Sequence, residues 1–321
     1  MSRRDRSGLL SPTAGKPRIR QDVRLFLMAL PFLALIFVFS YLPLYGWIYA
    51  FFDFRPGFRL ADCEFRGLFF FRLMVSDPVS RGEVIRVLTN TFAISGLNLS
   101  IQVLPLFFAV FLVEIRSSRL RRTVQSLTTM PNFLSWPLVF AFAYSMLSVD
   151  DGFINRLLVQ VGALGNPVNF LASSDHVWLT QTGYLVWKTL GWTAIIYLAA
   201  ISSIDSELYE AAEIDGADRF RIMRHITIPH LLPTFFVLVL LSIANFLNNG
   251  MEQYFVFQNA LNKDRIEVLD LYVYNIGIRS GMMGYNYSFA TAVGVLKSLV
   301  SVVLLFVANW GSKRIRGVSI L

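Results

Sequence analysis

The sequence predicts an all-α membrane protein with six transmembrane helices. It is 55% hydrophobic and only 16% charged, whereas soluble domains are about 45–50% apolar and about 25% charged. The mean hydropathy is +0.54, and the apolar residues occur in long runs. This composition excludes a disordered chain and a disulfide scaffold, because apolar content is high and Cys63 is the only cysteine.

Six apolar segments have at least the length of about 20 residues that a helix needs to cross a bilayer. The first follows a long polar tail and no small-residue cleavage site comes after it, so we expect a retained anchor. Pro131 and Pro137 interrupt the third segment, and Lys188 and Gly191 interrupt the fourth. The segments are 25–49, 87–113, 124–147, 177–201, 234–257 and 287–310.

The distribution of Lys and Arg predicts that both termini are cytoplasmic. With the N-terminus inside, the inner segments carry 17 of the 29 Lys and Arg residues and the outer segments carry ten. Cytoplasmic loops are enriched in these residues. The expected organisation is a tail over 1–24, a transmembrane domain over 25–310 with a cytoplasmic loop at 202–233, and a tail over 311–321.

Catalytic and nucleotide-binding motifs are missing from the sequence. There is no phosphate-binding glycine loop, no zinc motif and no nucleophile motif. His225 and His230 lie five residues apart beside a proline and make a poor metal site. The basic residues flank apolar segments, where lipid and insertion bias explain them, so nucleic acid is not an expected partner. We therefore expect no catalytic residues, no metal and no cofactor on this chain.

The loop between the fourth and fifth spans predicts two short helices that could dock onto a soluble partner. Asp205 or Ser206 can cap the first helix, and Gly216 allows a tight turn or a close backbone approach. A second amphipathic helix follows from residue 217, and we expect Pro229 to end it. An ordinary interfacial loop is the alternative that composition alone leaves open.

The spacing in this loop resembles the "EAA" loop of ABC-importer permeases, whose pattern is E-A-A-x3-G-x9-I-x-L-P. Here Ile228 stands for the Leu of the pattern. The matching residues are Glu210, Ala211, Ala212, Gly216, Ile226 and Pro229. Further stretches similar to this family occur at 43–46, 90–91, 130–136, 204–209, 272–274 and 287–294, so the resemblance covers nearly the whole chain.

These stretches are most similar to the carbohydrate branch, the permeases for oligo- and polysaccharides that include the alginate importer subunit. The resemblance implies a type I ABC importer permease fold in the bacterial cytoplasmic (inner) membrane. It implies a second homologous permease as partner, so that a heterodimer is expected. It also implies two ATP-binding subunits, which would hold ATP and Mg, and an extracytoplasmic solute-binding protein. The loop containing Glu210 would then be the coupling helix that enters a cleft of the ATPase.

Polar residues within the spans predict a solute path. Ser242, Asn245, Asn249 and Glu252 recur at spacings of three and four, which would place them on one helical face. A charge at mid-bilayer is costly, so Glu252 and the lysines should face the bundle interior or a wet cavity. The expected path residues are Asn245, Asn249, Glu252, Lys188, Trp192 and Lys297.

The sequence is compatible with two roles for the charged residues Glu252, Lys188 and Lys297. Glu252 could instead pair with Lys188 or Lys297 as structural support. The two lysines also hint at an acidic saccharide. We expect a permease subunit that carries an oligo- or polysaccharide inward. A permease for a peptide or another small polar solute is the first alternative, and an intramembrane enzyme is the second.

Overall fold

The computed structural model describes residues 18–279 and 286–316, and the chain divides into two units, 1–48 and 49–321. The first unit holds α1 (Arg18–Ile36), the π-helical turn η1 (Phe37–Tyr41) and the start of the 3-10 helix η2 (Leu42–Phe51). Side chains 23–45 are exposed although most are apolar. Such a helix has lipid as its natural surroundings.

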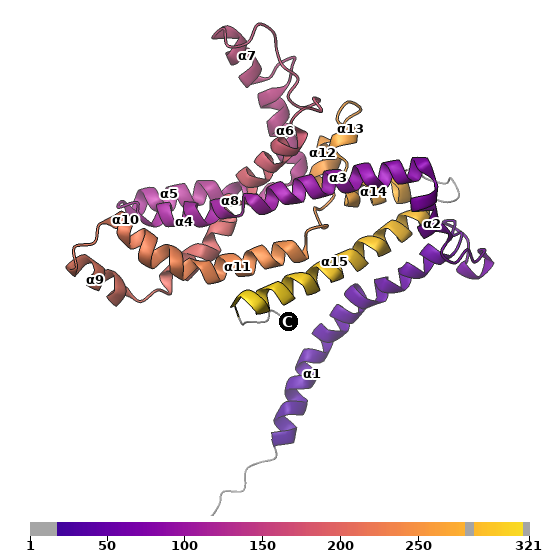
Figure 1. Cartoon of the computed structure of the whole chain (residues 1–321), viewed down its shortest axis with the longest axis horizontal. Coiled ribbons are helices and arrows are strands. Elements are labelled where there is room, and N and C mark those ends of the chain that lie inside the picture. Colours follow the sequence, from indigo (N-terminus) through magenta and orange to yellow (C-terminus); the bar gives the residue numbers. More distant parts are fainter. Residues whose placement is uncertain (1–17, 280–285, 317–321) are drawn as a thin grey trace, which may run out of the picture. The chain divides into compact units, whose positions relative to one another are not determined.

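The second unit is built from helices, which confirms the all-α prediction (Figure 1). Within the described ranges there is no β-strand, and one isolated bridge joins Phe52 and Phe65. The elements are η3 (Leu60–Asp62), α2 (Phe69–Ser76), α3 (Pro78–Ser100), α4 (Val103–Val113), α5 (Ser118–Thr129), η4 (Met130–Phe133), α6 (Trp136–Leu147), α7 (Phe153–Gln160), α8 (Val177–Ser202), α9 (Ser206–Ile214), α10 (Arg219–Ile222), η5 (Met223–Thr227), α11 (Ile228–Ala244), α12 (Glu252–Phe257), α13 (Lys263–Ile266), α14 (Leu269–Tyr274), η6 (Asn275–Arg279) and α15 (Asn286–Arg316).

In the described part of the chain, five helical stretches are long and apolar enough to cross a membrane. The second of them joins α3 and α4 across a short break at residues 101–102. Pro105 explains this break, because it has no N–H to donate to the carbonyl four residues earlier. The stretches are Val23–Phe51, Pro78–Val113, Val177–Ser202, Arg219–Ala244 and Tyr287–Gly311.

The α3–α4 span and α8 pack together and run in the same direction. Leu97, in the middle of the α3–α4 span, and Leu179, near the start of α8, line one cavity. Near their ends, Val110 and Ile201 belong to one buried cluster, to which Leu231 of α11 also contributes. The chain must therefore travel back along the bundle between α4 and α8.

The predicted third span, 124–147, is wrong as a single helix. α5 ends at Thr129, a 3-10 turn follows, and α6 begins at Trp136. Pro131 and Pro137 cannot donate backbone hydrogen bonds to the preceding turn, which explains the interruption. The Lys188 Nζ of α8 donates to the carbonyls of Pro131 (3.3 Å), Asn132 (2.9 Å) and Leu134. The helix break is thus held from a neighbouring helix.

The predicted fifth span, 234–257, is also wrong in its limits. The helix starts earlier and ends at Ala244, and residues 245–251 form an irregular segment before α12. Gly250 has φ +75° in this segment, a conformation that favours glycine. Pro229 does not end a helix as expected, because the chain continues from α10 through the π-helical turn η5 into α11.

Candidate functional site

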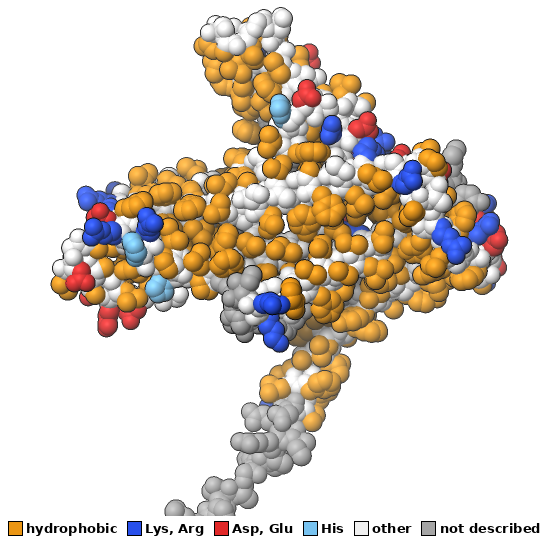
Figure 2. Space-filling view, viewed as in Figure 1, with side chains coloured by type: hydrophobic (Ala, Val, Ile, Leu, Met, Phe, Trp, Pro, Cys, Tyr) orange, Lys and Arg blue, Asp and Glu red, His pale blue; other side chains and the backbone are white. Residues whose placement is uncertain are grey.

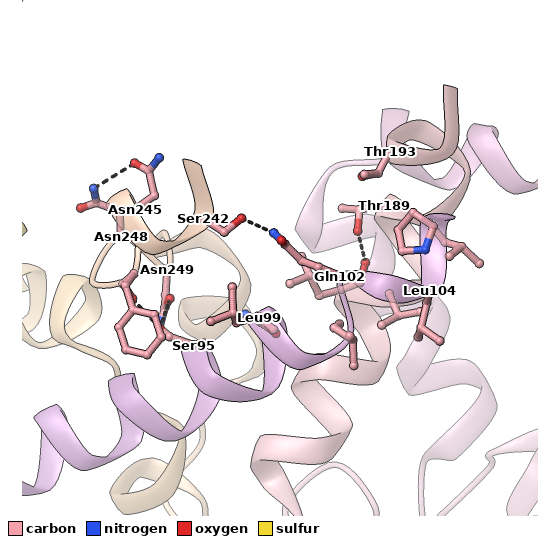
Figure 3. A pocket seen from close by; sticks show the side chains of 17 residues that line it. Ser95, Leu99, Gln102, Leu104, Thr189, Thr193, Ser242, Asn245, Asn248 and Asn249 are labelled. Atoms are coloured by element: carbon pink, nitrogen blue, oxygen red, sulfur yellow. Dashed lines mark hydrogen bonds between the residues drawn. The ribbon is translucent and has the colours of Figure 1, made fainter. Parts of the chain in front are cut away.

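A polar cavity of about 330 Å³ lies between α3, the start of α4, α8 and the end of α11. Figure 3 shows side chains from these elements facing one another across it. Apolar residues such as Leu99 and Leu185 line it together with hydroxyl and amide groups. The polar lining residues are Ser95, Asn98, Gln102, Thr189, Thr193, Ser242, Asn245, Asn248 and Asn249.

The α3 side of the cavity arises from polar residues spaced three and four apart, which share one face of a helix. Ser95 donates to Asn249 Oδ1 at 2.8 Å, and Gln102 Nε2 donates to the Ser242 hydroxyl. Thr91, one turn before Ser95, accepts a hydrogen bond from the Leu269 N–H at 2.9 Å. The polar face of α3 therefore holds one wall of the cavity in place and also fixes the start of α14 at Leu269.

The irregular segment 245–251 forms the opposite wall. Asn245 Nδ2 donates to the Leu241 carbonyl at 2.9 Å, and Asn248 Nδ2 donates to Asn245 Oδ1 at 3.3 Å. Figure 3 shows Asn245 and Asn248 paired in this way, with Asn249 beside Ser95. The helix ends before Asn245. The amides of Asn245, Asn248 and Asn249 therefore lie together at the cavity and are not spread along a helix.

Two acceptor atoms of the lining have no hydrogen-bond partner among the described residues. They are Asn98 Oδ1 and Gln102 Oε1, and both are buried. Buried polar atoms are nearly always satisfied, and an unsatisfied one costs about 1–3 kcal/mol. A bound molecule with hydroxyl or amide donors would complete both atoms.

The predicted path residues separate into two groups. Asn245 and Asn249 line the cavity, and Trp192 lines an adjoining cavity of about 330 Å³ that shares Gln102 and Ser242 with the first. Glu252 is exposed at the start of α12 and lines neither cavity. The single helical face predicted from Ser242 to Glu252 is wrong, because α11 ends before Asn245.

Both lysines of the prediction are engaged with the protein itself. Lys188 is buried and bonded to the carbonyls of the α5–α6 break. Lys297 of α15 forms an ion pair with Asp270 of α14, whose other oxygen accepts the Gly250 N–H at 3.1 Å. Neither lysine pairs with Glu252 among the ion pairs of the described chain. Lys297 and Asp270 instead connect α15 to the irregular segment.

The loop between α8 and α11 presents two helices at one end of the second unit (Figure 1). The Asp205 carboxylate caps α9 by accepting the Glu207 N–H at 3.0 Å, as expected. Gly216 has φ +74°, which confirms a turn that favours glycine. Ile214 and Phe220 are 86% and 67% exposed, a large apolar surface for a polar loop. The six predicted docking residues all lie on α9, this turn, η5 or the start of α11.

Sequence reasoning missed several residues of this site. Thr189 and Thr193 of α8 line the cavity one helical turn apart, and their spacing within an apolar span was a usable signal. Asn98 shares a face of the α3 stretch with Ser95 and Gln102, at spacings of three and four that were also a usable signal. Asp270 was not expected to hold Lys297, because no pattern joins two residues so far apart in the chain.

The chain resembles known transport proteins over nearly all of its length. Residues 101–317 match the family described as binding-protein-dependent transport system inner membrane component. Protein LplB of Bacillus subtilis (strain 168) is 36% identical over 94% of both chains. The polygalacturonan/rhamnogalacturonan transport system permease protein YteP of the same strain is 36% identical over 92% of this chain and 90% of its own.

Solved structures agree with these sequence relatives. The chain matches a subunit of a bacterial ABC transporter involved in the import of the acidic polysaccharide alginate, with a TM-score of 0.81 and 29% identity over 93% of this chain and 98% of that one. A second structure, of the bacterial alginate ABC transporter with an alginate pentasaccharide-bound periplasmic protein, matches with a TM-score of 0.82. Together with the apolar spans, these matches show that the chain belongs to the binding-protein-dependent transport system inner membrane components and is an ABC permease subunit, not an enzyme.

Proposed function

We propose that the chain carries an oligo- or polysaccharide into the cell through the cavity between α3, α8 and α11. The unpartnered acceptors Asn98 Oδ1 and Gln102 Oε1 are the observation that carries this proposal. Saccharides present hydroxyl donors at the ring edge and C–H groups on the ring face. The cavity offers acceptors together with Phe246 and aliphatic side chains, and several relatives are named as saccharide permeases.

The membrane topology proposed is six crossings with both termini in the cytoplasm. The parallel directions of α3–α4 and α8 support it, because the chain must return across the membrane between Val113 and Val177. We assign this return to the broken helix α5–η4–α6. Helix α6 contains only 12 residues, so the crossing needs both halves. Irregular backbone is tolerated at membrane depth where protein buries it, as Lys188 does here.

Energy coupling is proposed to run through α9. Its exposed Ile214 and the nearby Phe220 would enter a cleft of a partner ATPase subunit, where ATP and Mg would be held. Arg219 of α10 lies 3.8 Å from Glu114 at the end of α4. Tyr209 of α9 shares a hydrogen bond of 3.2 Å with Thr227 just before α11. These contacts would transmit movement of the loop to the helices that line the cavity.

The proposed assembly contains a second, homologous permease, two ATP-binding subunits and an external solute-binding protein, in the bacterial inner membrane. The apolar side chains exposed on α11 and α15 support a permease partner, since a heterodimer would cover part of them. A neighbouring structure contains a periplasmic binding protein with bound saccharide. A binding protein would deliver solute at the end of the bundle away from α9.

Replacing Asn98 by Leu tests the saccharide path. The change removes one buried acceptor at nearly constant volume, and a lost hydrogen bond of about 0.5–1.5 kcal/mol predicts a roughly two- to tenfold fall in uptake of labelled oligosaccharide. The yield of assembled complex should stay normal. Ser100→Ala is the control, because Ser100 is exposed and bonded to the Gly96 carbonyl of its own helix.

Unchanged uptake by the Asn98→Leu variant would contradict the assigned path. If the unaltered transporter takes up a peptide and no saccharide, the proposed substrate class is wrong. The identification as a permease would still hold. Loss of assembled complex would assign Asn98 a packing role.

A further inference from the structure

A separate polar cavity of about 430 Å³ lies between the segment that follows α12 and the turn η6. It shares no residue with the cavity between α3, α8 and α11. We call it the basic cavity, because its described lining holds two cations and three amides and no carboxylate. Its lining residues are Gln258, Asn259, Ala260, Lys263, Asn275 and Arg279.

Lys263 and Arg279 have no ion-pair partner within the described ranges. The neighbouring acids are occupied elsewhere. Glu267 is almost fully buried and accepts hydrogen bonds from Arg86 at 2.8 Å and from Asn275 Nδ2 at 2.7 Å. Asp264 lies 3.5 Å from the same Arg86. The basic cavity therefore keeps a net positive charge.

The Gln258 amide adds a hydrogen-bond donor to the basic cavity. Asn275 Nδ2 bonds Glu267 and also reaches the Gln258 Oε1 at 3.5 Å. This contact distinguishes the two ends of the Gln258 amide. Its Nε2 is buried and has no acceptor in the described part of the chain. A buried donor without an acceptor is unfavourable, so a ligand oxygen here would be favoured.

Lysine, arginine and amide N–H groups together favour a ligand with anionic oxygen atoms. All of them donate, and a carboxylate accepts several such hydrogen bonds, which are about twice as strong when charge-assisted. We propose that the basic cavity binds the carboxylate of an acidic saccharide, that is, a uronate residue. This proposal rests on the proposed saccharide translocation and narrows its substrate from saccharides in general to acidic ones.

The place of the basic cavity in the fold agrees with this role. α12 and α13 lie away from α9 and α10 in Figure 1, toward the end at which the binding protein would deliver solute. Figure 2 shows basic side chains exposed toward this end of the second unit. Lys188 and Lys297 suggested an acidic saccharide from the sequence, but both are bonded within the protein. Lys263 and Arg279 line a cavity and are in no ion pair of the described chain.

A pair of probes that differ only in charge tests the proposal. One is a fluorescently labelled tetramer of galacturonate, and the other is the same tetramer fully methyl-esterified. The purified transporter containing the full chain, in nanodiscs and without its binding protein, is titrated with each. We expect the acid to bind at least about tenfold more tightly than the ester, the scale of one charged hydrogen bond. Raising the salt should reduce this preference, since exposed charges are screened.

The double variant Lys263→Gln/Arg279→Gln should weaken binding of the acid to the level of the ester and leave ester binding unchanged. Arg72→Gln/Arg81→Gln is the matched control, because both residues are exposed and neither lines the basic cavity. The control should keep the preference.

Equal binding of acid and ester by the unaltered transporter would overturn the proposal, and so would an unchanged preference in the double variant. If saccharide uptake persists in either case, the proposed function stands and only the acidic class is lost. If the unaltered transporter neither binds nor takes up any saccharide, both proposals fail.

Discussion

Lys188 illustrates how a charged residue inside a span can serve the protein itself. Its ammonium donates to three carbonyls of the α5–α6 break, of which that of Pro131 also accepts the Leu134 N–H. It also lies 5.4 Å from the centre of the Trp136 ring, on whose face a cation is attracted. A buried cation needs such partners, because burial without them is costly. Lys188 therefore stabilises the break between α5 and α6 and is not free to bind solute.

Replacing Lys188 by Met should destabilise the chain. The partly buried carbonyls of Asn132 and Leu134 would lose this donor, at a cost of about 1–3 kcal/mol. The thermal unfolding midpoint of the purified chain should fall, and Lys188→Arg should retain part of the stability. A variant that loses uptake with an unchanged midpoint would instead make Lys188 a solute contact.

At the scale of elements, α8 is the helix on which several other helices pack. It packs on α3, α4, α5 and α11, and its contact with α5 is especially close. A Cβ built on Gly191 would lie 2.4 Å from the carbonyl carbon and oxygen of Thr128. Real side chains do not approach backbone so closely, so only glycine allows this packing.

Gly191 and Gly183 form a matched pair within one helix. Gly191→Ala should push α5 from α8 and destabilise the chain by about 1–3 kcal/mol, as overpacking does. Gly183→Ala has open space around its new methyl group and should stabilise the helix by about 0.5–1 kcal/mol. Thermal unfolding of both variants measures the difference. Equal effects at the two positions would contradict the close contact.

Gly216 allows the docking role of the α9–α10 turn to be tested separately from its backbone conformation. Nothing of the chain lies within 4 Å of a Cβ built there, but φ is +74°, which Asn tolerates better than Leu. If only the conformation matters, Gly216→Asn should retain binding-protein-stimulated ATPase activity and Gly216→Leu should lose it. If an ATPase subunit approaches closely, both variants should lose stimulation while assembling normally. Normal stimulation in Gly216→Leu would contradict both readings.

The helices and their breaks differ in how far they could be predicted. Apolar runs predicted α8 and the apolar part of α15 almost to the residue, because lipid selects for length and hydropathy. The end of α11 was missed because the polar spacing from Ser242 to Glu252 suits a helix, although Asn248, Asn249 and Gly250 form a turn signal. The hydrogen bonds of Lys188 could not be predicted, because every residue has a backbone carbonyl and the sequence does not indicate which ones accept from a side chain.

At the scale of the whole molecule, the orientation in the membrane is the main open prediction. The excess of Lys and Arg in the inner segments predicts both termini inside. Reporter fusions at residues 118, 215 and 321 should be cytoplasmic, and fusions at 60, 160 and 270 should be external. A cytoplasmic reporter at 160 would mean that α5–η4–α6 does not cross the membrane.

The bonds between Lys188 and the α5–α6 break have a consequence for biosynthesis. Residues 130–134 leave the ribosome before α8, so the carbonyls of Asn132 and Leu134 lack the Lys188 donor while that part of the chain is being made. Backbone groups without partners are excluded from lipid. In the proposed topology, where the broken helix crosses the membrane, it would therefore lack part of its backbone hydrogen bonding in the bilayer until α8 is made. We expect the broken helix to insert together with α8.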